Sequence, residues 1–218
     1  MNYSNMADNS KKPEEKNSHL RILAAGDIHG NSDLAKKLAD KAEKNNVDLV
    51  VLLGDIHGAH KSKNIIAPFK KANKKVIFVP GNWDSSFESL MSENIYDIRN
   101  IDGLYTMYNG VAFIGLGNPD FKLSVDERKS FDKLKGNFDK LYSNKSIRKK
   151  VLISHLHASG TKTDQLGFPG SSALRKAIDH FQPDFFLHAH IHETEGIEDR
   201  IGKTKIMNIG SKGKIIDL

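Results

Sequence analysis

Short apolar runs recur along the chain, and each one ends in small or polar residues. The run at residues 49–53, Leu-Val-Val-Leu-Leu, lacks the alternation of apolar and polar residues that a half-exposed strand shows. Continuous apolar runs of this length are typical of strands that are buried on both faces. We therefore predict buried strands at residues 20–25, 48–53, 76–79, 111–114, 151–153 and 185–187.

Amphipathic stretches at 32–43, 125–141 and 171–181 separate several of these runs and predict helices. Because strands and helices alternate, the pattern favours parallel βαβ units. The C-terminal part differs: residues 195–200 and 204–209 flank a Gly-Lys turn and predict a hairpin, and a last strand is expected at 214–217. The fold class is therefore α/β, as a layered domain whose sheets become mixed near the C-terminus.

The 218 residues suit one domain with a flexible end. Residues 1–18 are polar and have almost nothing to bury, so we predict a disordered tail at 1–18 and a single domain at 19–218. The sequence has no cysteine, which excludes disulfides, thiolate metal sites and cysteine nucleophiles. It also has no apolar run of roughly 20 residues and no apolar core of a secretory signal, so we expect a cytoplasmic protein without a membrane partner.

The formal net charge is +6, and it belongs to the predicted domain because the tail holds three lysines against three acidic residues. One interpretation is a basic face that attracts nucleic acid or another anion. The other is a solvated, lysine-rich surface with no partner. Many lysines lie in pairs on predicted helices, as at Lys36 and Lys37, which favours the second interpretation.

Polar clusters rich in Asp, His, Asn and Gly follow five of the predicted strands, at 26–31, 54–58, 80–84, 154–157 and 188–192. In open α/β sheets, ligands bind outside the carboxyl ends of the strands, which is where these clusters lie. Carboxylate, imidazole and amide donors suit Mn, Fe, Zn or Ni better than a soft metal. Two metals that share a carboxylate, about 3.5–4 Å apart, would form the clamp used in phosphoryl displacement.

The series of motifs resembles the calcineurin-like metallophosphoesterase superfamily, in particular its small bacterial and archaeal phosphodiesterases. The family pattern is Asp-x-His, Gly-Asp, Gly-Asn-His-Asp/Glu, a His motif and Gly-His-x-His. Here it is matched by Asp27-Ile28-His29, Gly54-Asp55, Gly81-Asn82-Trp83-Asp84, His155 and Ala189-His190-Ile191-His192. The resemblance covers His19 to the C-terminus and implies a metallophosphoesterase-type sandwich of mixed β-sheets flanked by helices.

The resemblance also implies which residues bind two divalent metal ions, with Mn²⁺ or Ni²⁺ favoured and Fe or Zn possible. The ligands of one ion would be Asp27, His29 and His192. The ligands of the other would be Asn82, His155 and His190. Asp55 would bridge the two ions, and a bridging hydroxide would attack phosphorus. Asn82 would also contact a phosphate oxygen, which makes it a catalytic candidate.

Trp83 stands where the family usually has a His that stabilises the transition state and protonates the leaving group. The indole N–H cannot transfer a proton usefully near pH 7. Candidates for a substitute acid are His157, His57 and His60, and His157 is the best placed of them. His157 and His57 have an alternative role in supporting a metal ligand. Trp83 itself could stack on a substrate ring or pack as a lid residue.

The expected function is metal-dependent hydrolysis of a small phosphodiester. Alternatives on the same site are a nuclease, a phosphomonoesterase and a non-catalytic metal-binding scaffold. Nucleic acid is a possible partner but not the favoured one. The family resemblance makes a homo-oligomer plausible. The Asn208–Ser211 segment resembles a turn that closes many sites of the family, and an ordinary turn is the alternative.

Overall fold

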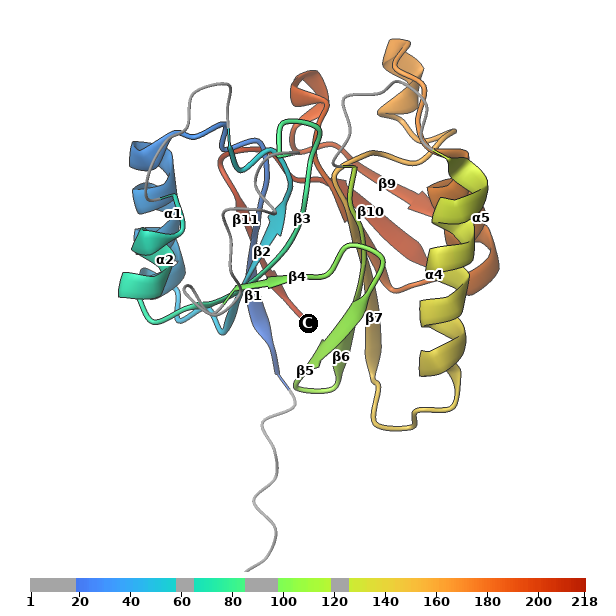
Figure 1. Ribbon diagram of the computed structural model, residues 1–218, viewed down its shortest axis with the longest axis horizontal. Helices are drawn as coiled ribbons and strands as arrows, with labels where there is room; N and C mark the ends of the chain where they lie inside the picture. Colours follow the sequence, from blue (N-terminus) through green and yellow to red (C-terminus); the bar gives the residue numbers. More distant parts are fainter. Residues whose placement is uncertain (1–18, 58–64, 85–97, 119–125) are drawn as a thin grey trace, which may run out of the picture.

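The computed structural model describes residues 19–57, 65–84, 98–118 and 126–218. Two β-sheets pack face to face in the centre, and helices cover the outer face of each sheet (Figure 1). The predicted α/β sandwich of mixed sheets flanked by helices is therefore confirmed. The predicted tail at residues 1–18 and the start of the predicted helix at residue 125 lie outside the described residues.

The first sheet has the strand order β11-β1-β2-β3-β4. Its strands are β1 (Arg21–Ala25), β2 (Leu49–Leu53), β3 (Lys75–Val79), β4 (Ile98–Asn100) and β11 (Lys214–Asp217). The strands β1 to β4 run parallel to their neighbours, whereas β11 returns from the far end of the chain and pairs antiparallel with β1. The C-terminal strand β11 therefore forms one edge of the sheet that also contains the first strand, β1.

The second sheet has the order β5-β6-β7-β8-β10-β9. Its strands are β5 (Tyr105–Tyr108), β6 (Val111–Leu116), β7 (Lys149–Ser154), β8 (Phe185–His188), β9 (Glu198–Ile201) and β10 (Thr204–Asn208). The four central strands are parallel, and β5 and β9 close the two edges in antiparallel pairing. β7 and β8 belong to these parallel strands, and predicted site residues follow directly after their carboxyl ends.

The core forms three apolar layers. The middle layer joins the inner faces of the two sheets, and its largest side chain is the fully buried Phe113. One outer layer packs α1 (Ser32–Lys44) and α2 (Ala67–Lys71) against the first sheet. The other packs α4 (Glu127–Tyr142) and α5 (Ser172–Phe181) against the second sheet. Both faces of the central strands are thus covered, which explains their uninterrupted apolar runs.

Each long helix begins at a side chain that accepts a backbone N–H of its first turn. Asn31 caps α1, Asp126 caps α4 and Ser171 caps α5. None of the helices in the described ranges combines the length and apolar character that crossing a membrane requires.

The structure differs from the prediction in short elements. The predicted strand at 195–200 begins only at Glu198, because a 3₁₀ turn, η2 (His192–Thr194), and Gly196 with φ 85° precede it. The strands β4 and β5 and the helix α2 were not predicted. Each is only three to five residues long, and so short an element shows too few repeats of a periodic pattern to be recognised.

Truncating Phe113 to alanine should lower the free energy of unfolding by about 3–5 kcal/mol, because the residual cavity would lie between two sheets that cannot collapse independently. Urea denaturation monitored by circular dichroism measures this change. The matched control is Tyr142→Ala, whose side chain is 87% exposed and whose loss should change stability by less than about 0.5 kcal/mol. Equal effects of the two variants would contradict the assignment of the central core.

The buried side chain of His188 should make stability depend on pH. Burial lowers its pKa from the ordinary 6.5 to about 3, only partly opposed by a hydrogen bond to the Ala189 carbonyl. The unfolded chain therefore takes up this proton first as the pH falls, so the folded state loses stability from pH 6.5 downwards. Between pH 6.5 and 4.5 this loss should be on the order of 2–3 kcal/mol.

The measurement is a series of urea midpoints on chelator-treated protein from pH 7.5 to 4.5, for the wild type and for His188→Gln. The variant lacks the titrating group, so its stability should fall less steeply with decreasing pH. Groups that do not interact with His188 titrate alike in both proteins and cancel in the difference. Parallel profiles would show that His188 does not titrate as its burial requires.

Candidate active site

The predicted site residues meet at one edge of the two sheets. The loops after β1, β2 and β3 come from the first sheet, and the loops after β7 and β8 come from the second. In Figure 1 the carboxyl ends of these strands point to the same end of the molecule. The face-to-face packing of the sheets thus brings segments together that are up to 165 positions apart, from Asp27 to His192.

The backbone at this edge is strained. Residues other than glycine rarely adopt positive φ angles, yet four residues here do: Asp27 (52°), His29 (46°), Asp55 (49°) and His190 (76°). Backbone hydrogen bonds hold the first two loops together, among them one of 2.8 Å from the His29 N–H to the Asp55 carbonyl. Such strain costs on the order of 1–3 kcal/mol per residue and clusters at functional sites.

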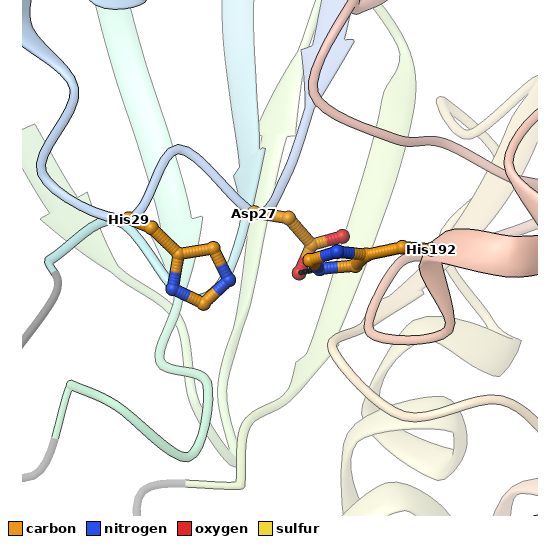
Figure 2. A group of neighbouring side chains, drawn as sticks. All are labelled: Asp27, His29 and His192. Atoms are coloured by element: carbon orange, nitrogen blue, oxygen red, sulfur yellow. Dashed lines mark ion pairs between the residues drawn. The ribbon is translucent and has the colours of Figure 1, made fainter.

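Asp27, His29 and His192 form the first group of ligand atoms, all within 4.8 Å of one another. Figure 2 shows the two imidazole rings approaching the Asp27 side chain from opposite sides. The Nε2 atom of His192 lies 3.6 Å from Oδ1 of Asp27. That oxygen is buried and has no hydrogen-bond partner among the described residues. A buried acceptor left without a donor is the position at which a cation would be bound.

Asp55, His155 and His190 form the second group, also within 4.8 Å. Nε2 of His155 lies 3.4 Å from Oδ2 of Asp55 and 3.0 Å from Nδ1 of His190. On its other side, Nδ1 of His155 lies 2.8 Å from the Leu53 carbonyl oxygen, to which it must donate. This bond selects the tautomer whose Nε2 is free to act as a ligand. Asn82 directs its Oδ1 at the same Nε2, at 3.0 Å.

The Asp55 carboxylate lies between the two groups. Its Oδ2 is 3.7 Å from Nε2 of His29 in the first group and 3.4 Å from Nε2 of His155 in the second. Its Oδ1 accepts a hydrogen bond of 2.9 Å from the backbone N–H of Trp83, which fixes the plane of the carboxylate. One oxygen of this carboxylate therefore faces both groups.

The electrostatics show a demand for positive charge. Burial is the largest influence on Asp27 and raises its pKa. Burial would also raise the pKa of Asp55, but the hydrogen bond and charge of His155, with the Trp83 N–H, leave it lowered. Burial opposes a charged His155, yet Asp55 and Asp27 raise its pKa. The two carboxylates therefore favour a positive charge beside them, and divalent cations fit this donor set and charge.

Asp84 supports the site in a role that the sequence did not reveal. Its fully buried carboxylate accepts the backbone N–H groups of Ile56, His57 and Gly81, at 3.3, 3.0 and 2.8 Å. It thereby ties the loop after β2 to the loop after β3. A Cβ at Gly81 would lie 2.3 Å from Oδ1 of Asp55, so only glycine fits there. Asp84 was visible in the sequence as the last residue of the Gly-Asn-Trp-Asp motif. A carboxylate in such a motif, however, suggests a metal ligand more readily than a residue that holds two loops together.

The candidate acids lie in different places. His157 is buried, and its Nε2 lies 2.9 Å from the Phe168 carbonyl oxygen. This contact favours a positioning role, and its role as an acid stays a prediction. Burial lowers the pKa of His57, whose N–H is bound by Asp84. His60 lies outside the described residues. Trp83 is 39% exposed, with its ring edge-on to His29 at 6.2 Å.

Asn208 stabilises the turn that presents His192. Its buried Nδ2 donates to the Ile191 carbonyl at 2.8 Å and to Oγ1 of Thr194 at 2.6 Å, the two ends of the η2 turn. Two residues on, the carbonyl of Gly210 accepts the N–H of Gly26, at 3.4 Å. The segment from Asn208 onwards thus packs beneath the first and last motifs instead of forming an isolated surface turn.

Comparison with solved structures finds the same fold in distant proteins. The protein TT1561 of Thermus thermophilus is 19% identical with a TM-score of 0.69, covering 88% of this chain and 90% of its own. A dimetal phosphatase from Danio rerio is 14% identical with a TM-score of 0.62 and 88% coverage of both chains. An archaeal phosphodiesterase is 15% identical with a TM-score of 0.54, covering 91% of this chain and all of its own.

No curated protein matches the chain. The family described as calcineurin-like phosphoesterase, by contrast, matches residues 20–194. That range contains both groups of ligand atoms and the strands that carry them. The chain therefore belongs to the calcineurin-like phosphoesterase family.

Proposed function

We propose that the protein is a two-metal phosphodiesterase that hydrolyses a small phosphodiester. The observation that carries this proposal is the pair of adjacent ligand groups with the Asp55 carboxylate between them. The proposed ligands of one ion are Asp27, His29 and His192. The proposed ligands of the other are Asn82, His155 and His190, with Asp55 shared. Mn²⁺ or Ni²⁺ suits this mixture of imidazole, carboxylate and amide donors, and Fe or Zn is an alternative.

When bound, two such ions would polarise the phosphate oxygens and lower the pKa of the attacking water. The protein contributes the positions of the donors. His155 is held by the Leu53 carbonyl and Asp55 by the Trp83 N–H, so neither side chain has to reorganise during the reaction. Because Oδ1 of Asn82 faces His155, its amide Nδ2 is the group left to donate to a phosphate oxygen.

The open side of the site supports access for a substrate. The side chains of His29 and His192 are 33% and 58% exposed, whereas those of Asp27 and Asp55 are each 3% exposed. Trp83 borders the same opening beside His29. We infer that a small diester enters from the side of His29 and His192, and that Trp83 contacts one of its ester groups. Nucleic acid remains the less favoured substrate.

The variant Asp55→Asn should abolish metal-dependent hydrolysis of bis-p-nitrophenyl phosphate, with a loss of at least about 100-fold. Mutation of a residue that only hydrogen-bonds to a metal ligand typically lowers activity by about 10–100-fold, and mutation of a ligand shared by two ions should lower it further. The assay uses protein stripped of metal and reloaded singly with Mn, Ni, Fe, Zn or Mg. The control is Asp139→Asn, which removes the same charge from the exposed face of α4 and should keep full activity.

Parallel assay of p-nitrophenyl phosphate separates the alternatives. Preference for this monoester would replace the proposed function with a phosphomonoesterase. Tight metal binding without turnover of either ester would favour the scaffold. A fully active Asp55→Asn variant would contradict the shared-ligand site itself.

Trp83 cannot protonate a leaving group, so the rate should depend steeply on the leaving-group pKa. Aryl diesters should be hydrolysed much faster than alkyl diesters. Trp83→His should raise the rate for poor leaving groups by about tenfold relative to good ones, at the low end of the range for general acid catalysis. Trp83→Phe is the control, because it removes the indole N–H without adding an acid and keeps the backbone N–H that holds Asp55. Equal dependence on the leaving group in wild type and Trp83→His would exclude this explanation.

A further inference from the structure

The loops after β1 and β8 touch each other at Gly26 and Ala189. Gly26 follows β1 directly and Ala189 follows β8 directly, so this contact joins the first sheet to the second. Ala189 is fully buried in the middle apolar layer. A Cβ at Gly26 would lie 2.6 Å from the Cβ of Ala189, whereas two carbon atoms in contact need about 3.5–4.0 Å. Position 26 therefore has no room for a side chain while Ala189 carries its methyl group.

Ala189 is also a departure from the family pattern. The motif Ala189-His190-Ile191-His192 begins with alanine where the pattern Gly-His-x-His has glycine. The chain thus carries a methyl group at a position where the pattern has none, and the structure accommodates it against Gly26. Neither Gly26 nor Ala189 has a positive φ angle. Contact between the two loops, and not backbone conformation, therefore excludes a side chain at position 26.

The two positions are matched in size. After Ala189, the atoms nearest to a Cβ at Gly26 would be the Leu53 Cβ at 3.4 Å and the Ile209 carbonyl oxygen at 3.5 Å, which are ordinary contact distances. The methyl group of Ala189 is therefore the only severe overlap. Moving one methyl group from position 189 to position 26 would conserve the buried volume and remove this overlap, and volume-conserving changes are the ones that a packed core tolerates best.

A ligand candidate follows each of the two residues directly. Asp27 belongs to the first group of ligand atoms and His190 to the second. The N–H of His190 donates to Oδ2 of Asp27 at 3.2 Å, and the N–H of Ala189 donates to the carbonyl of His155, another ligand candidate, at 3.1 Å. Asp27 and His190 both have strained positive φ angles, so little freedom remains to absorb a shift of the residue before them.

We propose that Gly26 and Ala189 are positioning residues whose matched sizes set the separation of the two ligand groups. This inference rests on the proposed function and names the contact that holds its two ions at a fixed distance. Both residues act through the ligands that follow them. A change in the combined size of the two side chains displaces Asp27 relative to His190, whereas an exchange of the two side chains does not.

The test is a double-mutant cycle on the binding of Mn²⁺ to the full chain after chelator treatment. Isothermal titration calorimetry measures the number of bound ions and their dissociation constants. Gly26→Ala should weaken the binding of at least one ion by about tenfold or more, the loss seen when the surroundings of metal ligands are disturbed. Ala189→Gly leaves a void of one methyl group and should weaken binding less. The double variant Gly26→Ala/Ala189→Gly should bind both ions within about twofold of the wild type.

Electron paramagnetic resonance gives a second measurement that altered stability alone would not change. In the chain loaded with two Mn²⁺ ions, the magnetic coupling between the ions depends on their separation. The wild type and the double variant should give the same coupled spectrum, and Gly26→Ala should show uncoupled Mn²⁺. The control is Ala177→Gly, which removes a fully buried methyl group from α5 and should lower stability without changing Mn²⁺ binding.

A double variant that binds Mn²⁺ no better than Gly26→Ala would overturn the inference, and so would a Gly26→Ala variant that binds both ions like the wild type. If Gly26→Ala does not fold alone, the double variant must still fold and give the coupled spectrum, and its failure to do so counts against the inference. Restored coupling supports the inference even if no ester is hydrolysed, so failure of the proposed function is distinguishable. A wild type that does not bind two Mn²⁺ ions would overturn both.

Discussion

Two buried carboxylates, Asp27 and Asp55, are the constraint around which this end of the molecule is organised. Each lies at the carboxyl end of a central strand, shielded from water, where negative charge is costly unless it is compensated. Asp55 and Asp27 raise the pKa of the neighbouring His155 although burial opposes a charge there, which indicates a demand for positive charge between the two carboxylates. The same demand explains why imidazoles from the second sheet converge on carboxylates from the first. Cation binding would satisfy it directly, which is the physical basis of the proposed two-metal chemistry.

Precise placement of these charges carries a cost in backbone strain. Asp27, Asp55 and His190 adopt positive φ angles that only supporting bonds can maintain. Asp84 provides such support by collecting three backbone N–H groups, and Gly81 allows the loop after β3 to approach Asp55 closely. These residues do not face a substrate. They keep the ligand atoms at positions that flexible loops would not hold.

The sequence predicted the central strands and the ligand candidates for a physical reason. Strands covered on both faces must be continuously apolar, and ligands in α/β sheets must follow the carboxyl ends of strands. The short edge strands β4 and β5 escaped prediction, because three or four residues define no period. The position of His157 also could not be predicted. Its spacing from His155 suggested a place in the site, and the fold adds a contact of its Nε2 with the Phe168 carbonyl oxygen.

The sequence by itself determined the family, the layered α/β class and the types of donor available, because these depend on local patterns and motif order. The family resemblance had already implied how the donors divide into two groups with Asp55 shared. Tertiary structure decided the distances between these donors and the supporting role of the buried Asp84. These features depend on the packing of two sheets whose contributing loops are far apart in the chain. Distances between such loops are set by the core between the sheets, and no local pattern encodes them.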